Sequence, residues 1–60
     1  MMPRLFVEVF LSPVTGDWHA ALVTISGRVR WCGPAHRTEA AARSQAEAEL
    51  AARRARGVAA

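Results

Sequence analysis

The first half of the chain contains two apolar runs with the composition of β-strands. Residues 4–11, RLFVEVFL, are rich in β-branched and aromatic side chains, and residues 18–25, WHAALVTI, form a second such run. A cluster of turn-forming residues, SPVTGD, separates them at positions 12–17. Strands favour β-branched and aromatic residues, whereas Pro, Gly and Asp interrupt them. The pattern therefore predicts two strands joined by a loop.

A third strand is predicted over residues 28–32, RVRWC, directly after Ser26-Gly27. A two-residue connection that contains glycine is typical of a tight hairpin, because glycine tolerates the positive φ that such turns need. Gly33-Pro34 then ends the strand. The second and third strands are therefore expected to pair as an antiparallel hairpin.

The last third of the chain has a helical pattern. Thr38 is a good N-cap, and Glu39 lies in the first turn, where the helix dipole favours a negative charge. A helix is expected over residues 39–56, with Gly57 at its C-terminal stop. Small and apolar side chains recur on one helix face at Ala42, Ala46 and Leu50. The chain is thus expected to be a single α+β domain over residues 1–60, a three-stranded antiparallel sheet packed on one C-terminal helix (β-β-β-α).

The hairpin predicts which side chains share a face of the sheet. A two-residue turn at 26–27 places Leu22 opposite Trp31 and Val23 opposite Arg30. Strand side chains alternate between the two faces, and charges are assigned to the uncovered face. The face against the helix is expected to hold Leu5, Val7, Val9, Leu11, Leu22, Thr24, Val29 and Trp31. The uncovered face is expected to hold Phe6, Glu8, Phe10, Val23, Ile25, Arg28 and Arg30.

Composition and charge restrict the class of protein. A chain of 60 residues buries a small core, and its single cysteine excludes an internal disulfide, so a second copy or a partner would add stability. The net charge is +3 and every basic residue is an arginine, which favours anionic partners. The lone thiol and the lack of a signal-peptide pattern predict a cytoplasmic protein, and the apolar runs are too short to span a membrane.

The stretch Trp31-Cys32-Gly33-Pro34 matches the first four residues of the thioredoxin active-site motif. Thioredoxin chemistry needs a second cysteine to resolve the mixed disulfide, and Ala35 occupies that position. The motif also belongs at the start of a helix, whose dipole activates the thiol, whereas this cysteine is expected to end a strand. We therefore interpret the stretch as a strand end followed by a turn.

The other polar residues indicate neither a catalytic nor a metal site. His19, Cys32 and His36 lack the close paired spacing of zinc ligands. The sequence has no glycine-rich phosphate loop and no Ser-His-acid arrangement, and a chain this small has little room for a pocket. We expect no enzyme activity, no cofactor and no metal. A short basic cluster near the end of the expected helix comprises Arg53, Arg54 and Arg56. We interpret it as complementing the helix dipole, and contact with a phosphate is the alternative.

The uncovered sheet face is the expected partner-binding surface, with Phe6, Phe10, Arg28 and Arg30 as its contact residues. A contiguous apolar patch with arginines is typical of an interface, in which phenylalanines are anchors and arginines make charged or bidentate contacts. The expected partner is a protein or a nucleoprotein complex. Direct DNA or RNA binding, through arginines in the major groove or phenylalanines stacked on bases, is the alternative. A homodimer through the same face is a third.

Three short motifs lie within residues 18–50: a tryptophan that opens a strand, a Gly-Arg hairpin turn, and an Arg-Thr-Glu-Ala segment that leads into the helix. The residues are Trp18, Gly27-Arg28 and Arg37-Thr38-Glu39-Ala40. In these motifs the chain resembles the β-β-β-α arm-binding domain of phage tyrosine integrases. The resemblance implies sheet-in-groove DNA binding, with Arg28 and Arg30 as contacts. In size the chain is also similar to small phage-encoded inhibitors such as anti-CRISPR proteins, which bind host nucleoprotein complexes.

Overall fold

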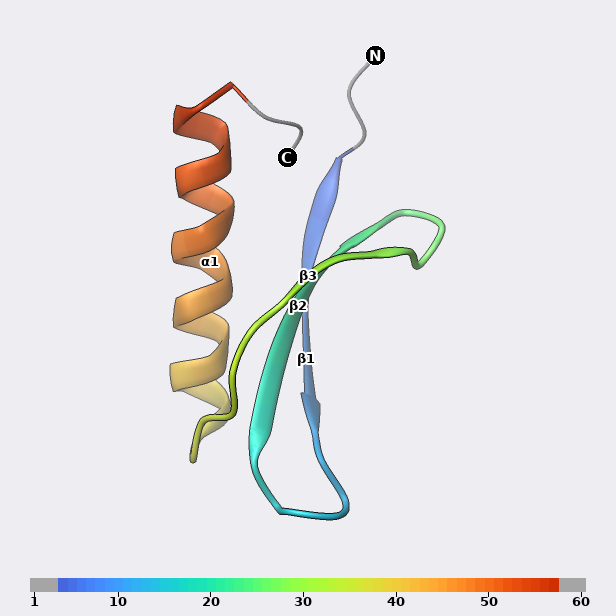
Figure 1. Ribbon diagram of the computed structural model, residues 1–60, viewed down its shortest axis with the longest axis vertical. Helices are drawn as coiled ribbons and strands as arrows, with labels where there is room; N and C mark the ends of the chain where they lie inside the picture. Colours follow the sequence, from blue (N-terminus) through green and yellow to red (C-terminus); the bar gives the residue numbers. More distant parts are fainter. Residues whose placement is uncertain (1–3, 58–60) are drawn as a thin grey trace.

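Helix α1 covers one face of a three-stranded sheet. The computed structural model describes residues 4–57. Its elements are β1 (Leu5–Leu11), β2 (Trp18–Thr24), β3 (Val29–Cys32) and α1 (Glu39–Ala55). The strands form one antiparallel sheet in the order β1-β2-β3, and α1 packs along β1 and β2 (Figure 1). The predicted β-β-β-α fold is confirmed, and no element within the described residues covers the second face of the sheet.

The β2–β3 hairpin differs from the prediction in its loop. The backbone N–H of Thr24 donates to the carbonyl of Arg28 at 2.9 Å, so the loop between them has three residues, Ile25, Ser26 and Gly27. Gly27 has a φ of 88°, as a glycine at the end of a three-residue hairpin loop commonly does. The predicted two-residue turn is therefore wrong, and Ile25 lies in the loop instead of on the uncovered sheet face.

A β-bulge restores the expected register further along the hairpin. Val23 pairs with Val29 and Leu22 pairs with Trp31, which leaves Arg30 as an extra residue on β3. The longer loop and the bulge each shift the register by one residue, and the two shifts cancel. The predicted pairing of Leu22 with Trp31 is confirmed. The predicted pairing of Val23 with Arg30 is wrong, and the register places Val29 on the uncovered face with Val23.

The core lies between α1 and the covered face of β1 and β2. Its buried members are Leu5, Ala20, Leu22, Ala42 and Ala46. Partly buried side chains pack around them, namely Val7, Val9, Trp18, Trp31 and Leu50. The alanines on both sides leave room for the helix to lie close to the sheet. The predicted helix stripe is confirmed, and Leu22 is the largest side chain that is fully buried among the described residues.

Helix α1 begins and ends at the positions that its capping residues favour. The backbone N–H of Ala41 donates to the hydroxyl of Thr38 at 3.1 Å, which satisfies one of the free amides of the first turn. At the other end Arg56 is the C-cap, and Gly57 follows with a φ of 73°. The expected helix boundaries are therefore confirmed to within one residue.

We predict that Leu22→Ala unfolds most of the protein. The substitution removes the fully buried side chain at the centre of the core and should lower the free energy of unfolding by about 3–5 kcal/mol, which is roughly the whole stability of a domain this small. Leu11→Ala is the matched control, because Leu11 is 49% exposed and the same truncation there should cost about 1 kcal/mol or less. Urea unfolding followed by circular dichroism measures both, and equal losses would contradict the position of the core.

Candidate interaction surfaces

The uncovered face of the sheet exposes two phenylalanines. Phe6 and Phe10 are 42% and 41% exposed, and neither belongs to the core under α1. They alternate along β1 with core residues, and they pair across the strands with Val23 and His19. Both side chains therefore lie on the uncovered face. We call this surface, with Phe6, Glu8, Phe10 and His19, the phenylalanine face.

Neighbouring side chains hold both rings in place. The ring of Phe10 stacks on the imidazole of His19, with 5.5 Å between the ring centroids and 12° between the planes. The guanidinium of Arg4 lies over Phe6 at 5.9 Å from the ring centroid, within the range of a cation–π contact. Between the two rings, Ala21 of β2 is buried although no helix covers it. One flat side of each ring is thus already in contact with the protein itself.

The register separates Arg28 from the phenylalanine face. Arg28 closes the hairpin opposite Thr24, and Thr24 pairs on its other side with Leu5 of the core. Since residues paired across strands share a face, Arg28 lies on the helix side of the sheet, at its end. Arg30 is the extra residue of the bulge. The expected placement of Arg28 with the phenylalanines is therefore wrong, because the longer loop shifts the register at this end of the hairpin. Arg30 has no partner in the register, so its expected place on the uncovered face stays a prediction.

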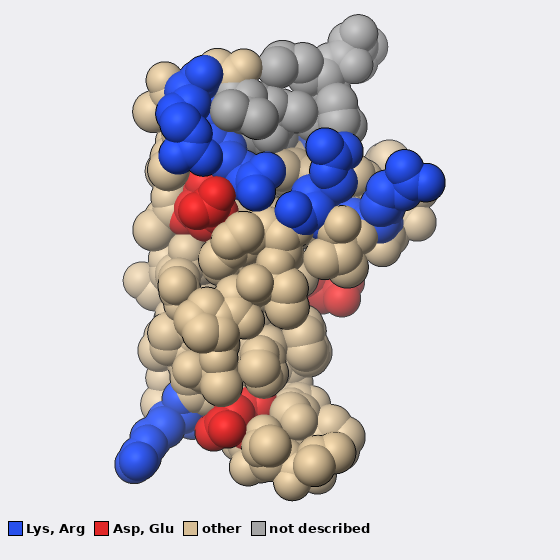
Figure 2. All heavy atoms as spheres, viewed as in Figure 1, with Lys and Arg blue, Asp and Glu red and all other residues tan. Residues whose placement is uncertain are grey.

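Arginines from three segments gather at one end of the molecule instead. The chain enters β1 at this end, the β2–β3 loop turns there, and α1 finishes there (Figure 1). Figure 2 shows basic side chains over the end of α1 and over the β2–β3 hairpin. The arginines at these element ends are Arg4 before β1, Arg28 and Arg30 at the beginning of β3, and Arg53, Arg54 and Arg56 at the end of α1. We call this surface, with the acidic Glu49, the arginine end.

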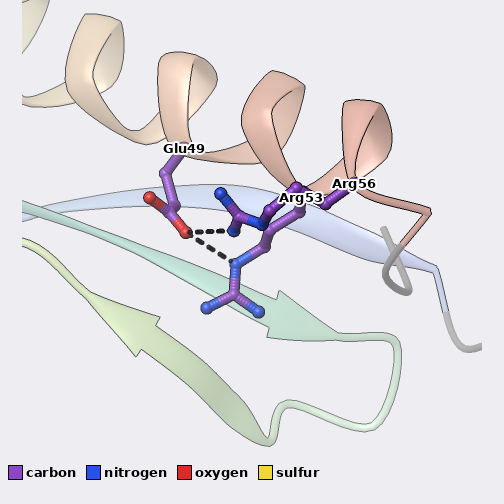
Figure 3. A network of polar contacts seen from close by, with 3 residues as sticks. All are labelled: Glu49, Arg53 and Arg56. Carbon is purple, nitrogen blue, oxygen red and sulfur yellow. Dashed lines mark hydrogen bonds and ion pairs between the residues drawn. The ribbon is translucent and has the colours of Figure 1, made fainter.

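Glu49 neutralises only part of this positive charge. Its carboxylate accepts a hydrogen bond from the Nε of Arg53 at 2.9 Å and lies 3.7 Å from a terminal nitrogen of Arg56 (Figure 3). The other four arginines of the arginine end make no ion pair with residues 4–57. Local sequence patterns do not combine these arginines, because their proximity depends on the directions of β1, the hairpin and α1.

The stretch that resembles the thioredoxin motif is explained by packing. A Cβ atom on Gly33 would lie 2.6 Å from the Cη2 atom of Trp31, so the indole ring lies directly over this glycine. The backbone N–H of Gly33 also donates to Ala20 of β2 at 2.9 Å. Cys32 is exposed at the end of β3, well before α1 begins. The predicted strand end at Cys32 is confirmed. The predicted turn after it is wrong, because the chain continues beside β2 to the antiparallel bridge between His36 and Trp18.

His36 connects the segment after β3 to both layers. Its backbone exchanges two hydrogen bonds with Trp18, of 2.7 and 2.8 Å, and its ring is hydrogen-bonded to Gln45 of α1.

Within residues 4–57, no three His, Cys, Asp or Glu side chains are grouped closely enough to hold a metal ion, and no pocket is present. None of the helical sequence described is both long and apolar enough to cross a membrane.

No family model, curated protein or solved structure matches this chain. The similarities to the integrase arm domain and to small phage inhibitors therefore stay expectations that rest on the motifs and the size of the chain. The features of the described residues that bear on function are the phenylalanine face and the arginine end.

We predict that Gly33→Ala destabilises the protein through Trp31. The new methyl group displaces the indole ring and should lower the free energy of unfolding by about 1–3 kcal/mol. In a Trp31→Phe background, which lacks the contacting ring atoms, the same substitution should cost clearly less, as a double-mutant cycle reveals. Urea titrations of the four proteins measure these differences. An equal cost in both backgrounds would contradict the assignment of Gly33 to packing under Trp31.

Proposed function

We propose that the protein is a non-enzymatic binding module whose phenylalanine face docks on a partner protein, alone or within a nucleoprotein complex. The observation that carries the proposal is the exposure of Phe6 and Phe10, 42% and 41%, on a sheet face that no described element covers. Large aromatic side chains that are held in place on a surface are typical anchors of protein interfaces. A small chain with such a face acts by covering a surface of its partner.

The chemistry of the phenylalanine face supports a protein partner over direct stacking on nucleic acid bases. Glu8 is exposed between the two phenylalanines on β1, and its carboxylate repels the phosphates that accompany any base. Each ring already uses one flat side within the molecule, whereas base stacking relies on free aromatic surfaces. The complementary surface of the partner is an apolar pocket with a hydrogen-bond donor that binds the carboxylate of Glu8.

The proposed mode of action is the one that the size of the chain suggests. Phage-encoded inhibitors such as anti-CRISPR proteins block host nucleoprotein complexes by occupying a surface, and we place this chain in that class of activity. The free and exposed thiol of Cys32 suits a reducing compartment, which supports action in the cytoplasm. Homodimer formation through the phenylalanine face is the competing outcome of the experiment that follows.

Site-specific photo-crosslinking tests the proposed function. A photoreactive phenylalanine analogue is introduced at residue 10 in the cells that encode the protein, and at residue 14 as the control. Val14 is 90% exposed in the β1–β2 loop, outside the strands that form the phenylalanine face. We expect a partner protein to be cross-linked from position 10 and not from position 14. Equal cross-linking from both positions, or cross-linking only to a second copy of the chain, would refute a dedicated docking face for another protein.

Affinity for the purified partner provides the second part of this test. The Phe6→Ser/Phe10→Ser variant should bind at least about tenfold more weakly, since aromatic anchors dominate interface energies. Val14→Ser should bind as the wild type does. Circular dichroism of each variant establishes that it is folded, and Phe10→Leu, which keeps an apolar side chain, should retain most of the affinity. Unchanged binding by the folded double variant would contradict the proposal.

A further inference from the structure

Charge is distributed unevenly along the molecule, and the positive charge of the arginine end exceeds the net charge of the whole chain. Its six arginines and Glu49 have a formal charge of +5, whereas the whole chain has +3. The remaining side chains therefore sum to −2; they are Arg37 and Arg43 with Glu8, Asp17, Glu39 and Glu47. Like charges at one end repel one another and destabilise a small domain. Their concentration indicates an anionic partner that offsets this cost.

We propose that the arginine end binds the phosphate backbone of a nucleic acid. Arginine presents a planar fork of donors that matches two phosphate oxygens at once, and every cation of this end is an arginine. Arg4, Arg28, Arg30 and Arg54 are exposed and have no ion pair within residues 4–57. The guanidinium groups of Arg28, Arg30 and Arg54 are therefore available without breaking an ion pair, whereas that of Arg4 also contacts the ring of Phe6.

The size of the arginine end fits a repeating polyanion. The Cα atoms span 37 × 22 × 13 Å, and the arginine end lies across the longest axis, so the two shorter dimensions describe it (Figure 2). Duplex DNA has one charge per about 1.7 Å of its axis. A 22 Å length of duplex therefore carries about a dozen phosphates around its circumference, and those on the near side can engage arginines from both the hairpin and the helix. A single phosphate group would reach only one segment.

The orientation of α1 argues against a lipid surface as the partner. Helices that bind membranes lie in the plane of the interface, with their apolar face inserted between basic residues. Helix α1 instead runs along the sheet and finishes at the arginine end, and its apolar stripe is buried on β1 and β2 (Figure 1). The helix offers no apolar face parallel to this surface.

Complementation of the helix dipole explains only half of the cluster. Arg53 and Arg54 lie in the last turn of α1 and Arg56 caps it, where cations are favourable next to free carbonyl groups. Arg4, Arg28 and Arg30 come from the sheet and have no such role. The phosphate-binding proposal accounts for all three segments. It does not rest on the proposed function of the phenylalanine face, because it requires binding in the absence of any partner protein.

A pair of charge-matched variants tests the position of the binding surface. Arg28→Gln/Arg54→Gln removes two cations from the arginine end, and Arg37→Gln/Arg43→Gln removes two from elsewhere, so both lower the net charge equally. Binding of the full chain to a labelled duplex of about 15 base pairs is followed by fluorescence anisotropy at several salt concentrations. We expect about tenfold or greater loss of affinity for the first variant and less than about threefold for the second.

The salt dependence supplies a second readout. The logarithm of the wild-type binding constant should fall against the logarithm of salt concentration with a slope of about −4 to −5, as for four to six phosphate contacts. Arg28→Gln/Arg54→Gln should reduce the steepness of this slope by about 2, and the control pair should leave it unchanged. Thermal unfolding followed by circular dichroism checks that both variants fold.

Three results would overturn the phosphate-binding proposal. Equal losses in the two folded variants would mean that only net charge matters. Absence of duplex binding at about 50 mM salt, with binding to phosphatidylserine-containing vesicles, would assign the arginine end to lipid. Loss of duplex binding in Phe10→Ser, which leaves the contact between Arg4 and Phe6 in place, would mean that the phenylalanine face itself binds the duplex. Normal duplex binding by this variant, together with loss of its protein partner, would instead establish both functions separately.

Discussion

The structure depends on the contact between one helix and one face of the sheet. Leu22 of β2 is buried beneath Ala42 and Ala46 of α1, and the remaining apolar side chains pack around this contact. Small alanines let the two layers approach closely, which concentrates the hydrophobic stabilisation that a chain of this length can obtain. The same arrangement leaves the second face of the sheet without cover, and the phenylalanine face is its consequence.

The direction of each element places the arginine end. β1 begins, the hairpin turns and α1 finishes on the same side of the core, so three stretches that are distant in sequence bring their cations together (Figure 1). The phenylalanine face extends away from this end and has Glu8 near its middle. The two surfaces therefore differ in chemistry, one apolar and the other basic. A nucleoprotein complex as partner would satisfy both proposals.

The β2–β3 hairpin separates Arg28 from the phenylalanine face. A three-residue loop followed by a bulge gives the same pairing of Leu22 with Trp31 as a two-residue turn without a bulge. Between the loop and the bulge, however, the faces differ from those that a two-residue turn would give. Arg28 lies on the helix side of the sheet, and Val29 lies on the uncovered side. Trp31 in turn packs over Gly33, which explains why a glycine follows this strand without any redox chemistry.

Local sequence patterns were sufficient for the element order, the helix caps and most of the core, because strand composition, capping residues and helical periodicity act over a few neighbouring residues. They also placed Phe6 and Phe10 opposite the core, since alternation along β1 is not interrupted. They wrongly assigned Leu11 and Val29 to the core, and both side chains are exposed. Only the tertiary structure decided the loop length, the bulge and the arginine end. The longer loop and the bulge shift the register in opposite directions, so periodicity alone does not distinguish this hairpin from one with a two-residue turn and no bulge. The arginine end depends on where whole elements begin and end in space.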